Sequence, residues 1–151
     1  MNVQSILAAK SRNLARNLGG DTITIEPTAD LAAAAKLLAA HKIGAVVICG
    51  AGGRLAGILS ERDIVRALAD YGAAALALPV GQVMTRNVMT CVEDDDVASL
   101  MERMTSGRFR HLPVLRDGKL IGLVSIGDVV KQRVETAEQE SEALRDYIRT
   151  A

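Results

Sequence analysis

Two short segments carry the polar residues that are best placed for chemistry, Ser60-Glu61-Arg62-Asp63 and Ser125-Ile126-Gly127-Asp128. In each, a serine stands three residues before an aspartate, after an apolar run and where a helical pattern begins. A carboxylate has two acceptor oxygens and can accept two neighbouring hydroxyl protons, while the free N–H groups of a helix start favour anions. The same spacing fits a capping box with Asp in place of Glu, which stabilises a helix by about 1 kcal/mol. The pattern alone leaves both roles open.

The elements that hold these segments occur twice, at a spacing of about 66 residues. The first copy predicts a strand, a helix, two strands joined by a glycine-rich turn, and a closing helix, at residues 22–25, 30–40, 45–49, 54–59 and from 60 onward. The second copy predicts the same series, at residues 88–91, 97–104, 112–115, 119–124 and from 125 onward. Both copies close on Gly-x-x-Ser-x-x-Asp followed by two apolar residues. Each copy is therefore expected to fold as β-α-β-β-α.

The duplication predicts a fold of the α+β class. A unit of about 45 residues cannot cover both faces of a three-stranded sheet, so we expect the two sheets to pack on each other and leave grooves at the join. The predicted order is N-terminal helix, first domain, linker, second domain and C-terminal helix, at residues 1–19, 20–71, 72–83, 84–135 and 136–151. The terminal helices carry narrow apolar stripes, one reaching Leu18 and the other formed by Leu144, Tyr147 and Ile148. Such stripes fit a dimer interface or packing on the helix's own domain.

Gly57 to Asp63 closes the first copy, and Val83-Met84-Thr85 opens the second. Together with their order and repetition over about residues 20 to 134, these segments strongly resemble a pair of cystathionine-β-synthase (CBS) domains, a Bateman module, of the stand-alone bacterial type. The resemblance implies a pseudo-twofold axis between the domains, two candidate nucleotide clefts, and frequent dimerisation into a flat disc of four domains. Members of the family bind AMP, ADP, ATP, NAD or S-adenosylmethionine and report the ligand to a partner or an attached domain.

The resemblance also implies roles for individual residues. Asp63 and Asp128 are the expected ribose ligands, because each carboxylate can accept both hydroxyl protons. Ser60 and Ser125 are expected to hydrogen-bond the ribose or a phosphate at the helix start. The adenine ring needs an apolar slot with backbone groups at its edges. Two segments are candidates to supply it from the facing copy: Ile43-Gly44-Ala45 and Arg110-His111-Leu112-Pro113.

The phosphates of a nucleotide need cations, and the two copies divide them unequally. The candidates by position in the family pattern are Arg110 and His111 for the cleft with Asp128, and Arg62 with Arg108 near by for the other cleft. Thr24 and Thr90, at the ends of the first strands, are expected to line the two clefts. The second copy has Gly127 where the first has Arg62, so whether one cleft or both fill is left open.

Composition narrows the classes of protein. Lys and Arg together number 18, as do Asp and Glu, so we expect no basic face for nucleic acid. The longest apolar stretches fall far short of the roughly 20 residues of a membrane span, which predicts no membrane contact and a cytoplasmic location. Cys49 and Cys91 lie in apolar, strand-like runs and are interpreted as buried free thiols rather than a disulfide.

The leading hypothesis is a regulatory, non-catalytic module that binds an adenine nucleotide between two CBS domains and signals by a change of conformation. AMP is the first expected ligand, with ATP, ADP and NAD as alternatives. Its partners would be a second copy of the chain and a regulated protein. No catalytic residue, metal ligand or catalytic cofactor is predicted, because no nucleophile and base pair, metal cluster or cofactor motif stands out. The alternative is a dimerisation or interaction scaffold whose nucleotide clefts are vestigial.

Overall fold

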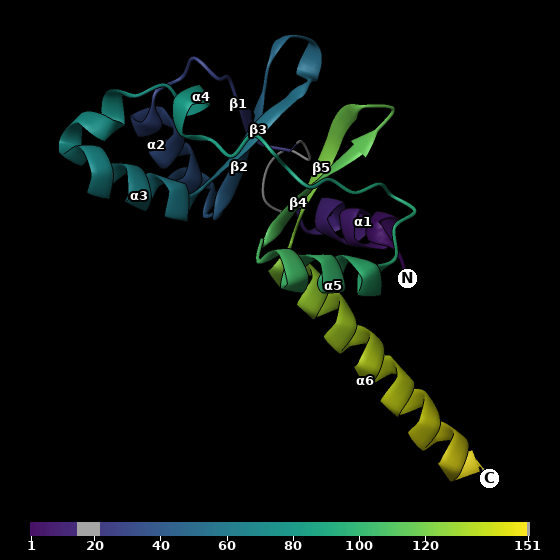
Figure 1. Cartoon of the computed structure of the whole chain (residues 1–151). Helices are drawn as coiled ribbons and strands as arrows, with labels where there is room; N and C mark the ends of the chain where they lie inside the picture. Colours follow the sequence, from purple (N-terminus) through teal and green to yellow (C-terminus); the bar gives the residue numbers. More distant parts are fainter. Residues whose placement is uncertain (15–21, 151) are drawn as a thin grey trace. The chain divides into compact units, whose positions relative to one another are not determined.

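A computed structural model of the chain describes residues 1–14 and 22–150. They form two compact units. The first, here called the sheet unit, contains described residues from 22–92 and 112–123. The second, here called the helical unit, contains described residues from 1–14, 93–111 and 124–150 (Figure 1). Part of the predicted N-terminal helix, with Leu18, and the first residues of the predicted first domain lie outside the described residues.

The sheet unit contains the three strands predicted for the first copy, β1 (Thr24–Ile25), β2 (Ala45–Cys49) and β3 (Leu55–Ser60). They lie in the order β1-β2-β3, with β1 parallel and β3 antiparallel to the central β2. Strand β2 is buried at four consecutive residues from Ala45 to Ile48, as expected for a strand covered on both faces. Helices α2 (Leu31–His41) and α3 (Glu61–Tyr71) complete the β-α-β-β-α series. The prediction for the first copy is confirmed.

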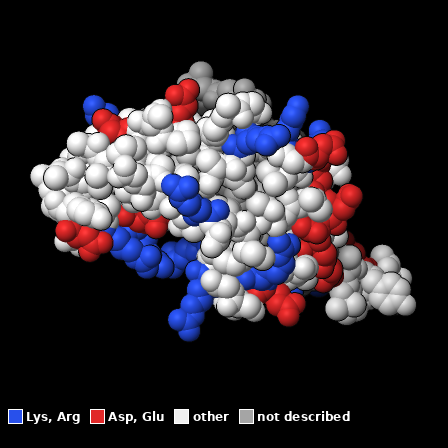
Figure 2. Space-filling model, turned by 45° about the horizontal axis from the view of Figure 1, so that its top comes forward, with Lys and Arg blue, Asp and Glu red and all other residues white. Residues whose placement is uncertain are grey.

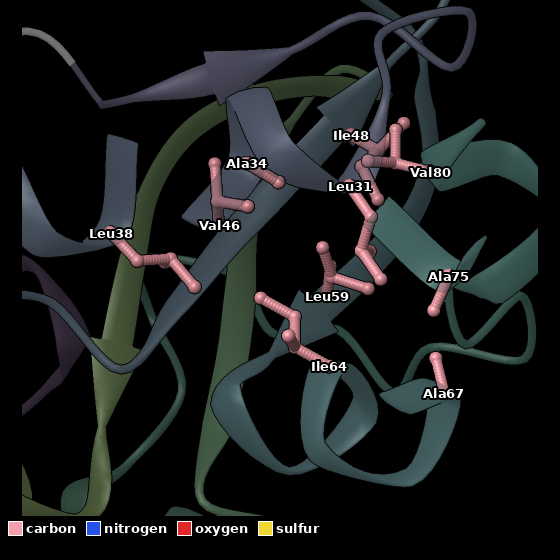
Figure 3. Close-up of a cluster of buried hydrophobic side chains, with 10 residues drawn as sticks. All are labelled: Leu31, Ala34, Leu38, Val46, Ile48, Leu59, Ile64, Ala67, Ala75 and Val80. Carbon is pink, nitrogen blue, oxygen red and sulfur yellow. The ribbon is translucent and has the colours of Figure 1, made fainter. Parts of the chain in front are cut away.

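One cluster of apolar side chains holds the sheet unit together (Figure 3). Helix α2 supplies Leu31, Ala34 and Leu38, which share one face because they are spaced by three and four residues. The full cluster adds residues from β2, β3, α3 and the segment that follows: Val46, Ile48, Leu59, Ile64, Ala67, Ala75 and Val80. The hydrophobic effect of removing these groups from water is the main force that fixes the unit.

The segment predicted as a linker packs on the first copy. It forms the short helices η2 (Gly72–Ala77) and α4 (Val80–Val83), and both Ala75 and Val80 are fully buried. Backbone hydrogen bonds join it to the start of α2, from Leu31 N to Leu78 O at 2.9 Å and from Val80 N to Ala29 O at 2.7 Å. The linker is thereby part of the sheet unit's core.

Gly57 is required because the segment of Met84 and Thr85 approaches β3 closely. A Cβ atom at this position would lie 2.6 Å from Met84 Sδ and 2.7 Å from the carbonyl oxygen of Thr85. Ile58 and Thr85 form a bridge there, with reciprocal backbone hydrogen bonds of 3.1 and 2.9 Å. The glycine of the repeated motif therefore has a packing role in the first copy.

The second copy forms a hairpin of β4 (His111–Arg116) and β5 (Lys119–Ser125). Asp117 and Gly118 connect them with φ of 51° and 77°, the pair of positive values that a type I′ hairpin turn requires. The predicted strand at 88–91 is not formed. Instead, Cys91 alone makes a parallel bridge to Val114.

A proline explains the missing strand. The bridge uses Cys91 N to Pro113 O and Leu115 N to Cys91 O, both at 2.9 Å. In a parallel ladder the next bond toward residue 88 would come from the N–H of residue 113 to the carbonyl of Met89. Pro113 has no N–H, so the ladder ends after one residue.

The helical unit consists of α1 (Val3–Leu14), α5 (Val97–Gly107) and α6 (Ile126–Thr150). Its buried side chains come from all three helices and include Val3, Ile6, Leu100, Met104 and Val129. The buried face of α5 is formed by Val97, Leu100 and Met104. The closing helix of the second copy and the predicted C-terminal helix are one continuous helix, α6.

The acidic run before α5 anchors the start of α1. Val3 N donates to Asp95 O at 3.0 Å and Gln4 N donates to Glu93 O at 3.1 Å. The carbonyls of this run thus satisfy two of the backbone donors that a helix start leaves without intrahelical partners. These bonds fix the chain's N-terminal helix to the second copy.

The surface carries no broad basic field on the face shown in Figure 2, where Lys and Arg side chains lie in separate groups. Among the described residues, no helix has the length and apolar character needed to cross a membrane.

Candidate nucleotide-binding sites

The first predicted site lies where β3 becomes α3. Ser60 is the N-cap of α3 and forms a capping box with Asp63. Asp63 Oδ2 accepts hydrogen bonds from Ser60 N at 2.9 Å and Ser60 Oγ at 3.1 Å, and the amide of Asp63 lies 3.3 Å from Ser60 Oγ. The capping role is therefore real. It uses only Oδ2, and Oδ1 of the same half-buried carboxylate can take a further donor.

The start of β2 lies beside this capping box. Ala45 pairs with Ser60 across the β2–β3 ladder, and Glu61 N donates to Gly44 O at 3.0 Å. The structure thus brings the predicted segment Ile43-Gly44-Ala45 next to the helix start that carries Ser60 and Asp63. Ala45 is buried, whereas Ile43 and Gly44 remain partly exposed.

The other predicted residues of the sheet unit lie at its edges. Thr24 is exposed on β1, opposite Val47 of β2. Arg62, in the first turn of α3, is also exposed. Thr90 precedes Cys91, whose backbone N–H donates a hydrogen bond to the carbonyl of the buried Pro113. This bond places Thr90 near Pro113.

The second predicted site lies where β5 becomes α6, within the helical unit. Asp128 Oδ2 accepts a hydrogen bond from Ser125 N at 2.9 Å, and Asp128 N donates to Ser125 Oγ at 3.1 Å. This is the same reciprocal cap as in the first copy. Ile126 N donates to Arg110 O at 2.7 Å, so Arg110 lies beside this helix start as Gly44 lies beside the other.

The predicted cations of the helical unit are at the end of α5 and the start of β4. Arg108 is the exposed C-cap of α5 and adopts a left-handed conformation with φ of 55°. Arg110 is exposed, and His111 is half-buried as the first residue of β4. Of these three residues, the hydrogen bond from Ile126 N places Arg110 beside the start of α6, which carries the Ser125 and Asp128 cap.

Lys10 is a site residue that the sequence did not reveal. Its Nζ lies 2.8 Å from Asp128 Oδ2, where it forms a hydrogen bond and an ion pair. Lys10 belongs to α1 and is 118 residues from its partner, so no local spacing could have pointed to the contact. The second copy lacks a counterpart of Arg62, and the N-terminal helix places a cation at its aspartate instead.

The environment of Asp128 favours its charged form. Burial opposes ionisation, but the hydrogen bond from Lys10, the backbone hydrogen bond from Ser125 and the positive charge of Lys10 outweigh it and lower the pKa of Asp128. The carboxylate is therefore ionised at neutral pH and remains an acceptor.

Metal binding and thiol chemistry find little support in the described residues. Within them, no group of three or more His, Cys, Asp or Glu side chains is placed to hold a metal ion. Cys49 and Cys91 are free thiols, of which Cys91 is buried and Cys49 is only partly so. Burial raises the pKa of the Cys49 thiol, which keeps it neutral and weakly nucleophilic.

Comparison with known proteins identifies the class. The CBS domain family model matches residues 16–70 and 80–135, one match for each copy of the repeat. The chain belongs to the CBS domain family, and it contains two such domains.

Similar proteins agree with this assignment. A CBS-domain containing protein from Agrobacterium tumefaciens has a crystal structure that matches with a TM-score of 0.79 and 46% identity, covering 88% of this chain and 99% of that one. A mitochondrial CBS domain-containing protein of Arabidopsis thaliana, CBSX3, is 38% identical over 119 residues, which are 76% of this chain and 58% of the plant protein. The chain thus spans little more than half the length of that relative. The predicted mixed helix and strand fold of a CBS pair is confirmed.

Two further structural matches contain adenosine compounds. A CBS domain protein from Pyrobaculum aerophilum, crystallised with AMP, has a TM-score of 0.70 and 25% identity over 85% of this chain and 89% of that one. The CBS domain pair of protein MJ0100, in complex with 5′-methylthioadenosine and S-adenosyl-L-methionine, has a TM-score of 0.75 and 27% identity, with 90% and 98% covered. CBS pairs of this fold therefore include adenosine-ligand binders.

Proposed function

We propose that this protein is a regulatory module that binds an adenine nucleotide, with AMP as the first candidate and ATP, ADP and NAD as alternatives. One observation carries the proposal. In both copies a capping box holds the aspartate by Oδ2 and orients the carboxylate at a helix start. A carboxylate fixed in this way loses little further side-chain entropy when it accepts the hydroxyl protons of a ribose.

The remaining predicted residues are assigned to the same ligand. Ile43, Gly44 and Ala45, which lie beside Ser60 and Asp63, are proposed to contribute to the apolar slot for the adenine ring. Arg62 and Arg108 are proposed as phosphate ligands of one cleft, and Arg110 and His111 of the other. Thr24, Thr90, Pro113 and Ser125 complete the proposed set. The adenosine compounds held by two structural matches support this class of ligand.

The proposed output is a change of conformation read by a partner protein, without catalysis and in the cytoplasm. A ligand that binds one arrangement of the chain more tightly shifts the population toward that arrangement. The proposed alternative is a dimerisation scaffold with vestigial clefts. It gains support from the helix-capping role that both Ser and Asp pairs already have.

A thermal-shift titration with AMP, ADP, ATP, NAD and S-adenosylmethionine tests the proposal. A bound ligand at about 100 times its Kd should stabilise the protein by about 2.7 kcal/mol, a shift of a few degrees. Asp63→Ala and Asp128→Ala, singly and together, should reduce or remove that response. Asp63→Ala should cost about 1 kcal/mol of stability and Asp128→Ala, which also loses the Lys10 ion pair, about 1 to 2 kcal/mol.

Asp30→Ala is the matched control. Asp30 caps α2 through a 2.8 Å hydrogen bond from Ala33 N, so its loss removes a cap without touching either proposed site. This variant should be destabilised like the others and keep the full ligand response. A full response in the Asp63 and Asp128 double variant would leave helix capping as the only role of these residues and favour the scaffold.

A further inference from the structure

Helix α6 carries an apolar stripe that its own unit does not cover. Its positions are four and three residues apart along the helix: Val130, Val134, Ala137, Leu144 and Ile148, with the small polar Ser141 on the same line between Ala137 and Leu144. Val134, Leu144 and Ile148 are 50%, 60% and 66% exposed. Figure 1 shows the C-terminal half of α6 extending past α1 and α5. Three large apolar side chains are thus exposed to water on a helix whose other exposed residues are mostly charged.

The face that α6 turns toward its own unit is a different one. Val129 is buried, and the side chains of Gln132 and Thr136 both donate to the sulfur of Met1. At about 100° per residue, this inner face lies roughly a third of a turn away from the stripe. Packing on the helix's own domain, one of the two roles that the sequence left open for it, therefore does not account for the stripe.

The spacing is that of a coiled-coil seam. Apolar residues alternating at four and three places occupy positions d and a of a heptad and pack against the same positions of another helix. Here Val134, Ser141 and Ile148 take position a, while Val130, Ala137 and Leu144 take position d. Val134 and Ile148 at a and Leu144 at d are the residue types that favour two parallel strands, while Ser141 and Ala137 are small.

The charges beside the stripe indicate the partner and its direction. In a parallel pair in register, each position g faces the position e five residues later in the other helix. Arg133 would then face Glu138 of the second copy, and Glu140 would face Arg145 of the second copy. Both contacts join opposite charges, and each forms twice by symmetry.

The antiparallel arrangement with full overlap of the stripe is unfavourable. In that arrangement like positions face each other, so Lys131 would face Arg145, and Glu138 and Glu140 would each face their own copies. These contacts join like charges, which repel.

We propose that the α6 stripe binds the same stripe of a second copy of this chain, as a parallel two-stranded coiled coil. The occupant is a second copy because the flanking charges complement themselves only in the parallel, symmetric arrangement. This proposal goes beyond nucleotide binding and does not depend on it.

Sedimentation analysis of the full chain tests the surface. The native protein should be a concentration-dependent dimer, and Leu144→Glu with Ile148→Glu should raise its dissociation constant by at least about tenfold. Ala143→Glu with Thr150→Glu adds the same two charges to the opposite face of α6 and should leave association unchanged. Both double variants change exposed residues, so thermal unfolding should show the domains intact. A native monomer, or a dimer that survives the stripe variant, would overturn the proposal.

The direction is tested separately. Arg133→Glu should weaken the dimer, and adding Glu138→Arg should restore it, because the exchanged charges again face each other. In a Cys49→Ala background, Ile148→Cys should form an intermolecular disulfide under mild oxidation. An antiparallel pair would hold these residues roughly 27 Å apart. Absence of the disulfide, or failure of the charge exchange to restore association, would contradict the parallel arrangement.

Discussion

The two copies of the repeat have the same order of elements, yet the structure builds them differently. The first copy forms a three-stranded sheet, β1-β2-β3, whereas the second forms a hairpin to which Cys91 adds a single bridge. Val47 and Pro113 occupy equivalent positions in the two central strands. Since they differ in one backbone N–H, the comparison shows how a single residue type limits a strand.

The two proposed sites differ in a similar way. Asp63 and Asp128 are held by equivalent capping boxes, but only Asp128 is shown bonded to a lysine, Lys10 of α1. The same local motif therefore occurs in two electrostatic environments. A duplicated motif need not keep a duplicated function when another part of the chain contacts only one of its copies.

The largest expected effect comes from giving the first copy the proline of the second. Val47→Pro should remove the N–H that faces β1 and leave a carbonyl of the β1 segment without its partner, at a cost of about 1 to 3 kcal/mol. Chemical denaturation measures this loss, and hydrogen exchange should show faster exchange at Thr24 and Ile25. An unchanged β1 would mean that pairing to β2 does not depend on this donor.

A smaller effect is expected from removing the lysine that distinguishes the second site. The pair is partly exposed, 36% for Lys10 and 23% for Asp128, so Lys10→Met should cost only about 0.5 to 1 kcal/mol at pH 7. Because folding lowers the pKa of Asp128, this stabilisation is present above the unfolded-state pKa and is lost as pH falls through the folded-state value.

Unfolding free energies measured from neutral to acid pH check this prediction. The difference between native protein and Lys10→Met should shrink as the pH falls below about 4. Lys36→Met, which changes an exposed lysine of α2, serves as the control and should show no such convergence. A difference that is constant with pH would indicate lost packing of the lysine stem instead of lost charge.

The smallest effect is expected from the reverse exchange in the second copy. Pro113→Val supplies the missing N–H, and the parallel pairing should extend by one hydrogen bond to Met89. One such bond contributes about 1 kcal/mol or less, partly offset by the freedom that proline loss returns to the unfolded chain. Hydrogen exchange should show new protection at the amide of residue 113. No protection there would mean that Pro113 is not what ends the ladder.

The fold was largely predictable because its signals are local. Apolar runs on either side of a glycine-rich turn predicted β2 and β3, from neighbours a few residues apart. Both Ser and Asp pairs were predicted in the same way, from residues three apart. The prediction of a strand at 88–91 was wrong because strand pairing depends on the partner strand, here β4 with Pro113, as well as on the residues themselves.

The sites were predictable only in part. The sequence placed Asp63 and Asp128 at helix starts, and the structure confirms that placement. Their contact with a nucleotide stays a prediction, as do the roles of the cations and the division into domains at 20–71 and 84–135. The pairing of Lys10 with Asp128 had no signal in the sequence, since a lysine at the surface of a helix is ordinary.

The sequence by itself determined the duplication, the type of most elements and the caps that orient both aspartates, because each depends on residues close together along the chain. Only the tertiary structure decided that α1 is anchored to the second copy, that Lys10 binds Asp128 and that the α6 stripe is uncovered. These features depend on which distant segments pack together and exclude water. Such packing is set by the whole folded chain, so a short stretch of sequence does not reveal it.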